Sequence, residues 1–540
     1  METLYHNGAI ITMEDGPEPE VVLVKDGVIR FVGSFDEARD HAGPQAALVD
    51  LQGKCLMPGF IDPHSHIFMN GQMSVCAWLT DCTSYDDIIQ TLRKYIEEKS
   101  IGPEGIVMGW GYDHNFLKEG GHPDKRILDQ VSTEIPIMIL HISAHLACVN
   151  SRVLELAGIT AETPDPPGGV IGRLADGEPS GYLEEAGMVP AQGIIQGRMQ
   201  LDIRSLLTEM QRSFIENGVT TAQDGATTAG DLKALRLAAE QDLLTIDVVA
   251  YPLMPSNGVE LLHQNQDLCG GYRNHLKIGG YKLVLDGSPQ GRSAWMSKPY
   301  LNGEPRYCGY PWMEDKQVEA FVRTAVEEGQ QLLAHCNGDA ASEQYLNAYE
   351  KVQKEQNCGK DLRPVMIHCQ TVRNDQLERM ADLNMIASIF VGHVYYWGDV
   401  HLKNFGPERG HRISPVKDAI QRGVKVDFHQ DTPVTQPDML HSVWCAVNRT
   451  SRSGAVIGED QRISVYEALK AVTIHAAYQY FEEDSKGSIR EGKRADLVVL
   501  SHSPLKVGPH EIKDIKVLQT IKDGMIVYRA EKTCEREDWA

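Results

Sequence analysis

The sequence lacks any apolar run near the ~18 residues that span a membrane, and its N-terminus lacks a basic, apolar leader. The chain is also short of positive charge, because 52 Lys and Arg face 75 Asp and Glu and leave a formal net charge of −23. This charge argues against non-specific binding to nucleic acid or to an anionic membrane. Its 11 cysteines are scattered without a Cys-x-x-Cys pair, which is typical of reduced thiols. Together these absences predict a cytoplasmic protein with neither a nucleic-acid nor a membrane partner.

What the chain does contain is typical of a globular protein, since 42% of its residues are hydrophobic and 24% are charged. Its length of 540 residues exceeds that of one compact domain, so two or three structural units are expected. The sequence shows no internal repeat and no low-complexity segment.

Two histidines one residue apart, His64 and His66, follow the apolar run Cys55–Ile61. The run is predicted to be a short buried strand. Because strand side chains alternate between faces, both imidazoles are expected to point the same way and to chelate one divalent metal. A lone His-x-His is weak support, and the alternative is a pair of hydrogen-bonded histidines at a strand end.

Further apolar runs carry residues of the same chemical type. They are Leu332–Ala334 before His335, Pro364–Ile367 before His368, Val424–Phe428 ahead of Asp431, and Gly280–Leu285 around Lys282. The interval from His335 to His368 fits one strand-plus-helix unit, and the interval to Asp431 has room for two, with Met385–Val391 as the strand between. Such residues at the carboxyl ends of successive strands are typical of the active site of a (β/α)8 barrel.

Longer motifs around these residues make the chain similar to a known family. They are Pro58–Asp62 with His64 and His66, Gly109–Gly111, Asn150-Ser151, Lys282 with Asp286–Ser288, His335 with Gly338–Ala340, His368, Asp431–Val434 and Gly492–Leu500. On these motifs the chain resembles the amidohydrolase superfamily over nearly its whole length. Within it, the chain is similar to amidohydrolase family 3, which includes YtcJ-like and N-substituted formamide deformylase-like proteins. The motifs are specific for the superfamily and much less specific for a substrate.

The resemblance implies an α/β fold, namely a (β/α)8 TIM barrel with a discontinuous β-sandwich from both termini. Strand-like runs with Asp-Gly turn signals support this, at residues 10–13, 21–24, 29–32, 495–500, 517–521 and 525–528. We expect the sandwich at 1–56 and 486–530, the barrel at 57–485, and a charged, poorly ordered tail at 531–540.

The interval from His66 to Lys282 is too long for three strand–helix units of ~30 residues each. Val219–Asp224 and Ile246–Ala250 are predicted to be the second and third barrel strands. The excess, at about residues 70–200, is predicted to be an α/β insertion after the first barrel strand. Its strand-like runs are Ile106–Trp110 and Ile135–His141. An insertion on the C-terminal face of a barrel is well placed to act as a lid and specificity element.

The resemblance also implies a metal centre. Its ligands would be His64, His66, Lys282, His335, His368 and Asp431. We expect two metal ions, zinc on family grounds, although imidazole and carboxylate ligands also suit Mn, Fe and Co. In binuclear relatives the lysine carries a CO2-derived carboxylate that bridges the ions, and burial favours the neutral amine that reacts with CO2. The alternatives for Lys282 are a snorkelling side chain and a salt bridge to Asp286.

Asp431 matches the catalytic aspartate at the end of the eighth strand in the superfamily. Relatives usually have Gly-Ser before it, where this chain has His429-Gln430, and Glu at the position of Ile367. These departures put local substrate contacts and an outer contact of the metal site in question. The alternative role for Asp431 is a helix N-cap, since Pro433 and an amphipathic stretch follow.

Substrate-binding candidates are more dispersed. They are Trp110, Asp113 and His145 in the insertion, Arg292 after the Asp286–Ser288 motif, and His393 after the seventh predicted strand. Ordinary packing or surface exposure explains each of these residues about as well as binding does.

The resemblance implies a metal-dependent hydrolase of carbon–nitrogen bonds other than peptide bonds, acting on an N-acyl, N-formyl or related carboxamide. A metal lowers the pKa of bound water to about 7, and Asp431 takes the proton and passes it to the leaving amine. Two alternatives remain: a cyclic-amide hydrolase or deaminase on the same scaffold, and a non-catalytic metal-binding regulatory protein. Family architecture implies a homodimer with a small-molecule substrate.

Overall fold

The computed structural model describes residues 2–530 except 74, 145, 167–168, 199–202 and 357–358. The expected tail at 531–540 and the candidate His145 lie outside these residues. The chain divides into two compact units, Met1–Phe68 with Leu207–Ala540, and Met69–Leu206. The nine cysteines that the structure describes are free thiols. None of the described helices has the length and apolarity to cross a membrane.

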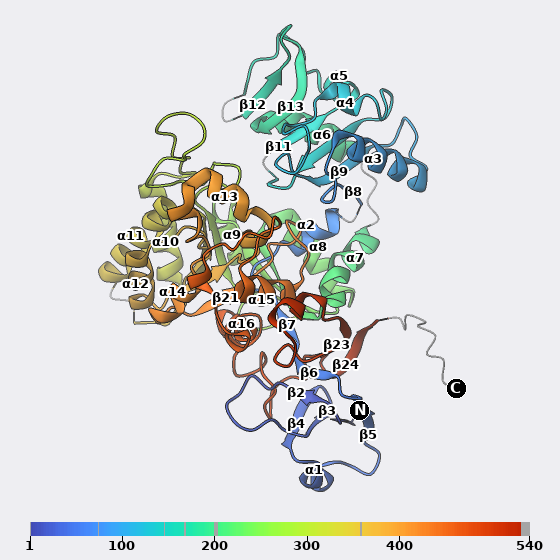
Figure 1. Ribbon diagram of the computed structural model, residues 1–540, viewed down its shortest axis with the longest axis vertical. Helices are drawn as coiled ribbons and strands as arrows, with labels where there is room; N and C mark the ends of the chain where they lie inside the picture. The colour runs from blue at the N-terminus through green and yellow to red at the C-terminus, as the bar shows by residue number, and fades with distance from the viewer. Residues whose placement is uncertain are drawn as a thin grey trace. The chain divides into compact units, whose positions relative to one another are not determined.

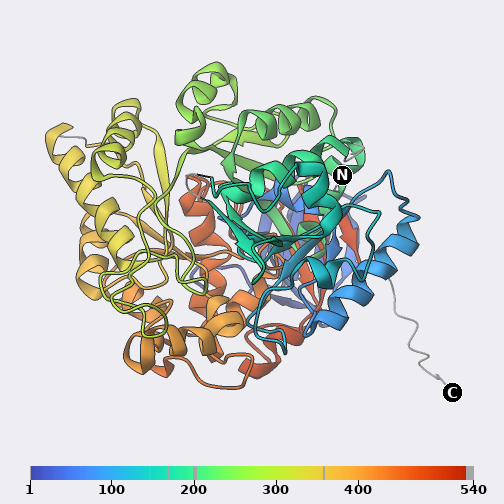
Figure 2. The same ribbon diagram turned by 90° about the horizontal axis from the view of Figure 1, so that it is seen from above.

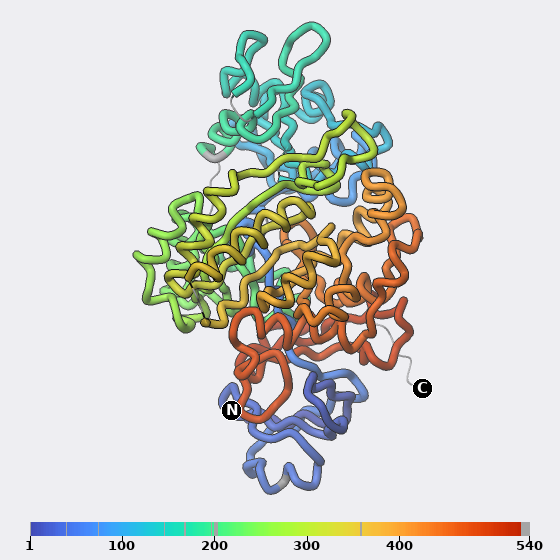
Figure 3. Tube along the Cα trace, turned by 90° about the vertical axis from the view of Figure 1, so that its left-hand side faces the viewer, coloured from blue at the N-terminus to red at the C-terminus, as the bar shows by residue number. Residues whose placement is uncertain are grey.

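Both ends of the chain build two small sheets in the first unit, where the N-terminal and C-terminal strands lie side by side (Figures 1 and 3). One has the order β4-β3-β1-β5, with β1 (Glu2–His6), β3 (Val21–Lys25), β4 (Val28–Gly33) and β5 (Ala47–Asp50); α1 (Phe35–His41) follows β4. The other has the order β2-β6-β22-β23-β24, with β2 (Ala9–Ile10), β6 (Cys55–Pro58), β22 (Leu497–Leu500), β23 (Val517–Lys522) and β24 (Met525–Arg529). Buried residues of both sheets share one hydrophobic core, so the two ends of the chain fold together.

The strand predicted over Ile10–Met13 is shorter than expected, since β2 ends at Ile10. The chain turns there because the Thr12 hydroxyl accepts the backbone N–H of Glu14 at 3.2 Å and Met13 adopts a left-handed φ of 61°. That conformation is incompatible with a continuing strand.

The middle of the first unit consists of two parallel sheets. One has the order β16-β15-β14-β7, with β7 (Phe60–Ile61), β14 (Val219–Thr227), β15 (Asp247–Pro252) and β16 (Leu276–Ile278). The other runs from β17 to β21, with β17 (Gly280–Val284), β18 (Gln331–Cys336), β19 (Val365–His368), β20 (Ile386–Ile389) and β21 (Val426–Phe428). Backbone contacts link the sheets at both junctions: Leu253, which follows β15, forms a parallel bridge with Lys282 of β17, and His66 N–H donates to Thr432 O at 2.8 Å.

Helices alternate with these strands, which confirms the α/β class. They are α7 (Ile203–Glu216), α8 (Ala229–Glu240), α9 (Gly258–Gln264), α10 (Asp315–Glu328), α11 (Asp339–Gln356), α12 (Asn374–Asp382), α13 (His393–Gly410), α14 (Val416–Gln421), α15 (Met439–Asn448), α16 (Val465–Ala471) and α17 (Ile474–Gln479). Local signals set their ends: α8 starts with a Thr228–Asp231 capping box, and α10 ends at Gly329 with φ 67°. In Figure 2, the green, yellow and orange helices of this unit lie around the outside of its strands.

The run Cys55–Ile61, predicted to be one strand, is two strands in different sheets. β6 pairs with β22 up to Pro58, and from Phe60 the backbone turns to β14, where Phe60 N–H donates to Gly218 O at 2.9 Å. Gly59 lies at the break, and a Cβ there would approach Thr220 Cγ2 to 2.5 Å. The predicted boundary at residue 57 therefore falls inside β6.

The second unit is a six-stranded mixed sheet with helices. The sheet has the order β12-β13-β11-β10-β9-β8, with β8 (Ala77–Trp78), β9 (Val107–Tyr112), β10 (Ile137–His141), β11 (Leu146–Val149), β12 (Gly169–Arg173) and β13 (Pro179–Glu185). Its helices are α3 (Tyr85–Lys99), α4 (Lys125–Leu128), α5 (Ser151–Ala157) and α6 (Val189–Arg198), and α2 (Ile67–Met73) leads into it. Two hydrophobic cores lie within this unit.

Candidate metal centre

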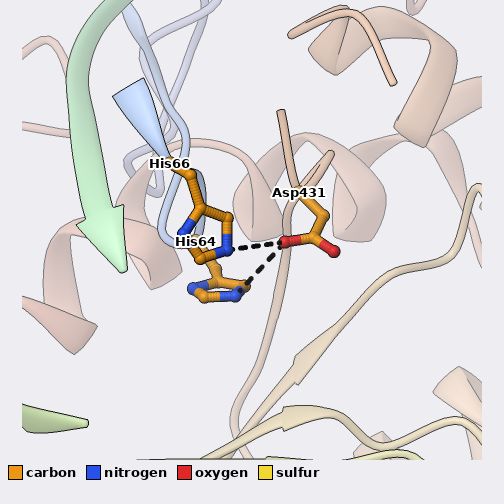
Figure 4. A group of neighbouring side chains, drawn as sticks. All are labelled: His64, His66 and Asp431. Carbon is orange, nitrogen blue, oxygen red and sulfur yellow. Dashed lines mark ion pairs between the residues drawn. The ribbon is translucent and has the colours of Figure 1, made fainter. Parts of the chain in front are cut away.

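His64 and His66 lie in the loop after β7, three and five residues beyond its last residue, Ile61. Both imidazoles nevertheless face the same carboxylate oxygen of Asp431, as Figure 4 shows. His64 Nε2 lies 3.3 Å and His66 Nε2 lies 3.4 Å from Oδ1 of Asp431. The loop is fixed to the segment after β21, because Asp431 N–H donates to His64 O and His66 N–H donates to Thr432 O.

Gln223 sets the tautomer of His64. The Gln223 amide nitrogen donates to Pro63 O at 2.6 Å, so its oxygen faces His64 Nδ1 at 2.7 Å and accepts from it. The proton on Nδ1 leaves the lone pair of Nε2 directed at Asp431 and at Lys282 Nζ, which is 3.3 Å away. Close packing also holds the ring, since a Cβ at Gly225 would lie 2.5 Å from His64 Cε1. Such outer contacts fix the orientation of metal-binding histidines.

Asp431 presents an oxygen without a donor. Oδ1 is buried and has no hydrogen-bond partner among the described residues, although His64 and His66 face it. Burial acts to raise the pKa of Asp431, but His66, His429 and Lys282 outweigh it and hold the pKa below its usual value. The residue has a φ of 55° and lies in a turn, and the next helix, α15, is capped by Asp438 instead. The helix N-cap role is therefore wrong.

Lys282 is buried inside β17, as the sequence predicted. Burial lowers its pKa to about 7, while the charge of Asp431 acts in the opposite direction. Asp286 is engaged elsewhere: its carboxylate accepts the backbone N–H groups of Asn337 at 3.0 Å and Gly338 at 2.7 Å. Burial raises the pKa of Asp286 to about 7 despite these bonds. The Lys282–Asp286 salt bridge considered above is thus not found in the described part of the chain.

His335 and His368 lie side by side at the ends of β18 and β19, with ring centroids 4.5 Å apart. Asn337 orients His335 by donating from its amide nitrogen to His335 Nε2 at 3.0 Å. His368 has a left-handed φ of 73° and lies with its centroid 5.5 Å from that of His64. Burial holds the pKa of His368 well below its usual value, with His335 as the next cause.

His429 is a site residue that the sequence reasoning treated only as a departure from the family pattern. It is fully buried, and its Nε2 lies 3.1 Å from His368 Nδ1 while Ser388 Oγ lies 2.9 Å from its Nδ1. Burial lowers its pKa to about 3. The period-two spacing from Asp427 to His429 and Asp431 was the available signal. Gln223 was also missed as a positioning residue, and nothing local marks its role.

These residues fit a divalent cation. The two facing acceptors, His64 Nε2 and Asp431 Oδ1, have no proton between them, and a cation satisfies both. Their separation of 3.3 Å is close to the distance of about 3.4 Å between two ligands of a tetrahedral ion with bonds of about 2.1 Å. Burial holds the pKa of His64 well below its usual value, so the imidazole is in the neutral form that binds metals. The nitrogen and oxygen donor set suits Zn, Mn, Fe or Co.

The substrate-binding candidates are not brought together in the same way. Trp110 is fully buried in a core of the second unit, and Asp113 is a buried residue of that unit. Arg292 donates to Asn302 O at 2.8 Å, in the segment after β17. His393 starts α13, and its Nδ1 lies 3.1 Å from His401 Nε2, with Phe390 stacked edge-on at 4.8 Å. Substrate binding by these residues remains a prediction.

Comparisons with known proteins agree with this chemistry. The profile of the Amidohydrolase family matches residues 47–528. The chain is 29% identical to the putative amidohydrolase YtcJ of Bacillus subtilis, over 98% of this chain and 99% of that protein. It is 28% identical to N-substituted formamide deformylase of Arthrobacter pascens, over 94% and 95% respectively. An uncharacterized metal-dependent hydrolase from Pyrococcus horikoshii has a similar fold, with a TM-score of 0.77 and 24% identity over 94% of this chain and 99% of that one.

Proposed function

Because the chain belongs to the amidohydrolase family, we propose that it is a metal-dependent hydrolase that cleaves a linear amide-type C–N bond, such as that of an N-formyl or N-acyl amine. The observation that carries this proposal is the buried Oδ1 of Asp431, which faces two imidazoles and receives no hydrogen bond in the described part of the chain. An acceptor held in this way is available both to a cation and to a proton from water.

The fold supports the proposal. We propose that the two parallel sheets are parts of one (β/α)8 barrel, closed by the backbone contacts at the two junctions. In such a barrel, catalytic groups lie at the carboxyl ends of the strands. Lys282, His335 and His368 lie in or at the ends of three successive strands. We also propose that the two terminal sheets, which share a core, form the expected β-sandwich.

Six residues would hold the metal: His64, His66, Lys282, His335, His368 and Asp431. A bound divalent cation supplies Lewis acidity, which lowers the pKa of a coordinated water to about 7 and polarises a substrate carbonyl. Zinc is the metal we propose, and two ions are favoured if Lys282 is carboxylated.

Asp431 would move the proton. Its pKa lies below the usual value, so the carboxylate is ionised at neutral pH and accepts a proton from the attacking water. The water oxygen bonds to the carbonyl carbon, and Asp431 then gives the proton to the leaving nitrogen as the C–N bond breaks. The products are a carboxylic acid and an amine, and Asp431 returns to its ionised form.

Lys282 is suited to carboxylation. Burial lowers its pKa to about 7, so a large fraction is the neutral amine at physiological pH. The amine nitrogen bonds to the carbon of CO2 and releases one proton, which leaves an anionic carbamate. This anion would take the place of the amine whose nitrogen lies 3.3 Å from His64 Nε2.

The proposed substrate class is based on the name of one similar protein. N-substituted formamide deformylase, by its name, removes the formyl group from N-substituted formamides, and this chain aligns with 95% of it. We therefore place N-formyl amines first among substrates, followed by N-acyl amines.

The test is metal content and turnover of the full chain, compared with Lys282→Ala and with Lys316→Ala, which removes an exposed lysine from α10. We expect Lys282→Ala to lose at least one metal ion per chain and to hydrolyse N-formyl and N-acyl amines far more slowly, while Lys316→Ala matches the wild type. Equal metal content in all three proteins would refute the ligand role of Lys282. Turnover of cyclic amides or ring amidines instead of linear amides would move the chain to the alternative reaction on this scaffold.

A further inference from the structure

A second group of metal-ligating side chains lies in the second unit, outside the centre described above. Asp113 and His114 follow β9, and His141 ends β10. We propose that Asp113, His114 and His141 bind one divalent cation of the zinc type, at a site built wholly from the second unit.

The sheet brings these residues together. β9 and β10 are parallel neighbours, and a register shift between Leu140 and His141 pairs His141 with Tyr112. The residues directly after Tyr112 therefore lie beside His141, at the carboxyl ends of both strands. The ladder fixes Tyr112 beside His141, and Asp113 and His114 are the next two residues of the chain.

The distances fit a cation. His114 Nδ1 lies 3.0 Å from His141 Nε2. Oδ1 of Asp113 lies 3.8 Å from the first of these nitrogens and 3.7 Å from the second. Ligands with bonds of about 2.0–2.1 Å to a tetrahedral zinc ion stand about 3.3 Å apart. The distance between the two nitrogens is a little shorter than this value, and the two distances to the carboxylate oxygen are a little longer. The three ligand atoms would therefore need to shift by only a few tenths of an ångström to bind the ion.

Burial and charge fit as well. The side chains of His141 and Asp113 are 1% and 7% exposed, while that of His114 is 27% exposed and leaves an entry path. Two imidazoles and one carboxylate form the borderline donor set that zinc prefers, and the single anion partly offsets the charge of the ion. Three protein ligands leave a fourth position for water or a small molecule.

Outer contacts hold the ligands in place. Ser143 contacts His141 Nδ1 twice, with Oγ at 2.8 Å and with its backbone N–H, which donates to Nδ1 at 3.1 Å, and these contacts fix the orientation of the His141 ring. Asp113 Oδ1 accepts the backbone N–H of Asn115 at 2.9 Å, which fixes the carboxylate. His122 stacks on His114 with centroids 4.2 Å apart and is itself held by Tyr112 OH at 2.9 Å from its Nδ1. Metal-binding residues typically have such partners.

The rival explanation is a histidine pair joined by an N–H···N hydrogen bond, with no ion. It accounts for the 3.0 Å contact between His114 and His141. A histidine pair of this kind does not require a carboxylate, whereas Asp113 Oδ1 lies within 3.8 Å of both nitrogens. The rival explanation also predicts that the second unit binds no cation.

The experiment is a Co(II) titration of the chelated full-length chain, with bound metal counted and the visible absorption of four-coordinate Co(II) recorded. We expect the variant with His114→Gln and His141→Gln to bind one Co(II) fewer than the wild type. The variant with His64→Asn and His66→Asn should keep that equivalent and its absorption, which separates this site from the proposed catalytic one. The number of Co(II) ions bound by each variant does not depend on whether the protein hydrolyses amides.

Two further variants guard against misfolding. His114→Gln alone changes the most exposed ligand and is expected to weaken Co(II) binding at this site at least 10-fold with an unchanged circular dichroism spectrum. His122→Gln, which removes a neighbour but no ligand, should keep the full stoichiometry. An unchanged metal count in the His114→Gln, His141→Gln variant, or no Co(II) retained when His64 and His66 are replaced, would overturn the proposal.

Discussion

The two histidine–aspartate clusters lie in similar positions relative to their strands, but their aspartates differ in hydrogen bonding. Both gather imidazoles and an aspartate just beyond the carboxyl ends of strands that belong to parallel pairs. In the second unit, Oδ1 of Asp113 accepts the backbone N–H of Asn115 and is anchored. In the first unit, Oδ1 of Asp431 has no donor in the described part of the chain. A carboxylate that is already anchored holds a ligand in place, whereas one without a donor can also take up a proton.

The clusters differ in a second respect, which is the lysine. Lys282 lies 3.3 Å from His64 Nε2 in the first unit. The second cluster consists of Asp113, His114 and His141. Lys282 gives the first cluster an amine that can become a carbamate, and we expect the first cluster to carry out hydrolysis.

The strongest test of this difference is Asp431→Asn against Asp113→Asn. Removing the proton acceptor should lower kcat by about 10²–10⁴-fold, the usual contribution of general acid–base catalysis. Asp113→Asn keeps the bond to Asn115 and should lower kcat by less than ~10-fold, because no proton passes through it. Steady-state kinetics on an N-formyl amine measures both. Equal losses of kcat in the two variants would contradict the proposed difference between the two clusters.

His429→Ser is expected to have the next largest effect. It removes the imidazole whose Nε2 lies 3.1 Å from His368 Nδ1. Loss of such an outer partner typically costs 10–100-fold in metal affinity or activity. Ser388→Ala is the graded control, since it removes only the hydroxyl that lies 2.9 Å from His429 Nδ1, and should have a smaller effect. Metal affinity measured with a competing chelator gives the ranking, and a reversed order would contradict it.

Replacing the residue that orients a histidine in each cluster is expected to have a smaller effect on metal binding. Gln223→Met removes the acceptor of His64 Nδ1, and Ser143→Ala removes the hydroxyl beside His141 Nδ1. Each should weaken metal binding at its own cluster by roughly 10-fold, the low end for such partners. Co(II) titration separates the two, because each variant should leave the other cluster unchanged. A change at both clusters in either variant would contradict their independence.

The smallest effect concerns stability against pH. Burial lowers the pKa of His401 to about 3, whereas an unfolded histidine titrates near 6.5. The unfolded chain therefore binds the proton first, so His401 contributes fully above pH ~6.5 and its contribution falls as pH drops towards 3. In the metal-free chain, His401→Phe should reduce the slope of unfolding free energy against pH by at most ~1.4 kcal/mol per pH unit between pH 6.5 and 5. Urea unfolding across that range measures it, and an unchanged slope would show that His401 is not buried neutral.

Much of the first cluster followed from the sequence. Lys282 inside an apolar run is in β17, and His335 is in β18, because a buried parallel strand reads as a continuous apolar run. The course of the chain near His64 was not predictable in the same way. A seven-residue apolar run reads as one strand, and only its two different partners divide it at Gly59.

The second cluster was only partly visible. Asp113 and His141 lie in or beside the predicted strands Ile106–Trp110 and Ile135–His141, but their pairing depends on a register shift that no local pattern indicates. The role of His429 was hidden for a similar reason, since its partner, His368, is 61 residues away in the chain.

The residue types of the proposed ligands, their order along the chain and the family could be predicted from the sequence alone. Side-chain chemistry and the period of apolar runs are local properties, so they can be read without a fold. The fold was needed to see that Asp431 Oδ1 has no donor among the described residues while Asp113 is anchored, and that Gln223 sets the tautomer of His64. These properties depend on which groups from distant segments fill the space around one atom, and packing of the whole chain decides that.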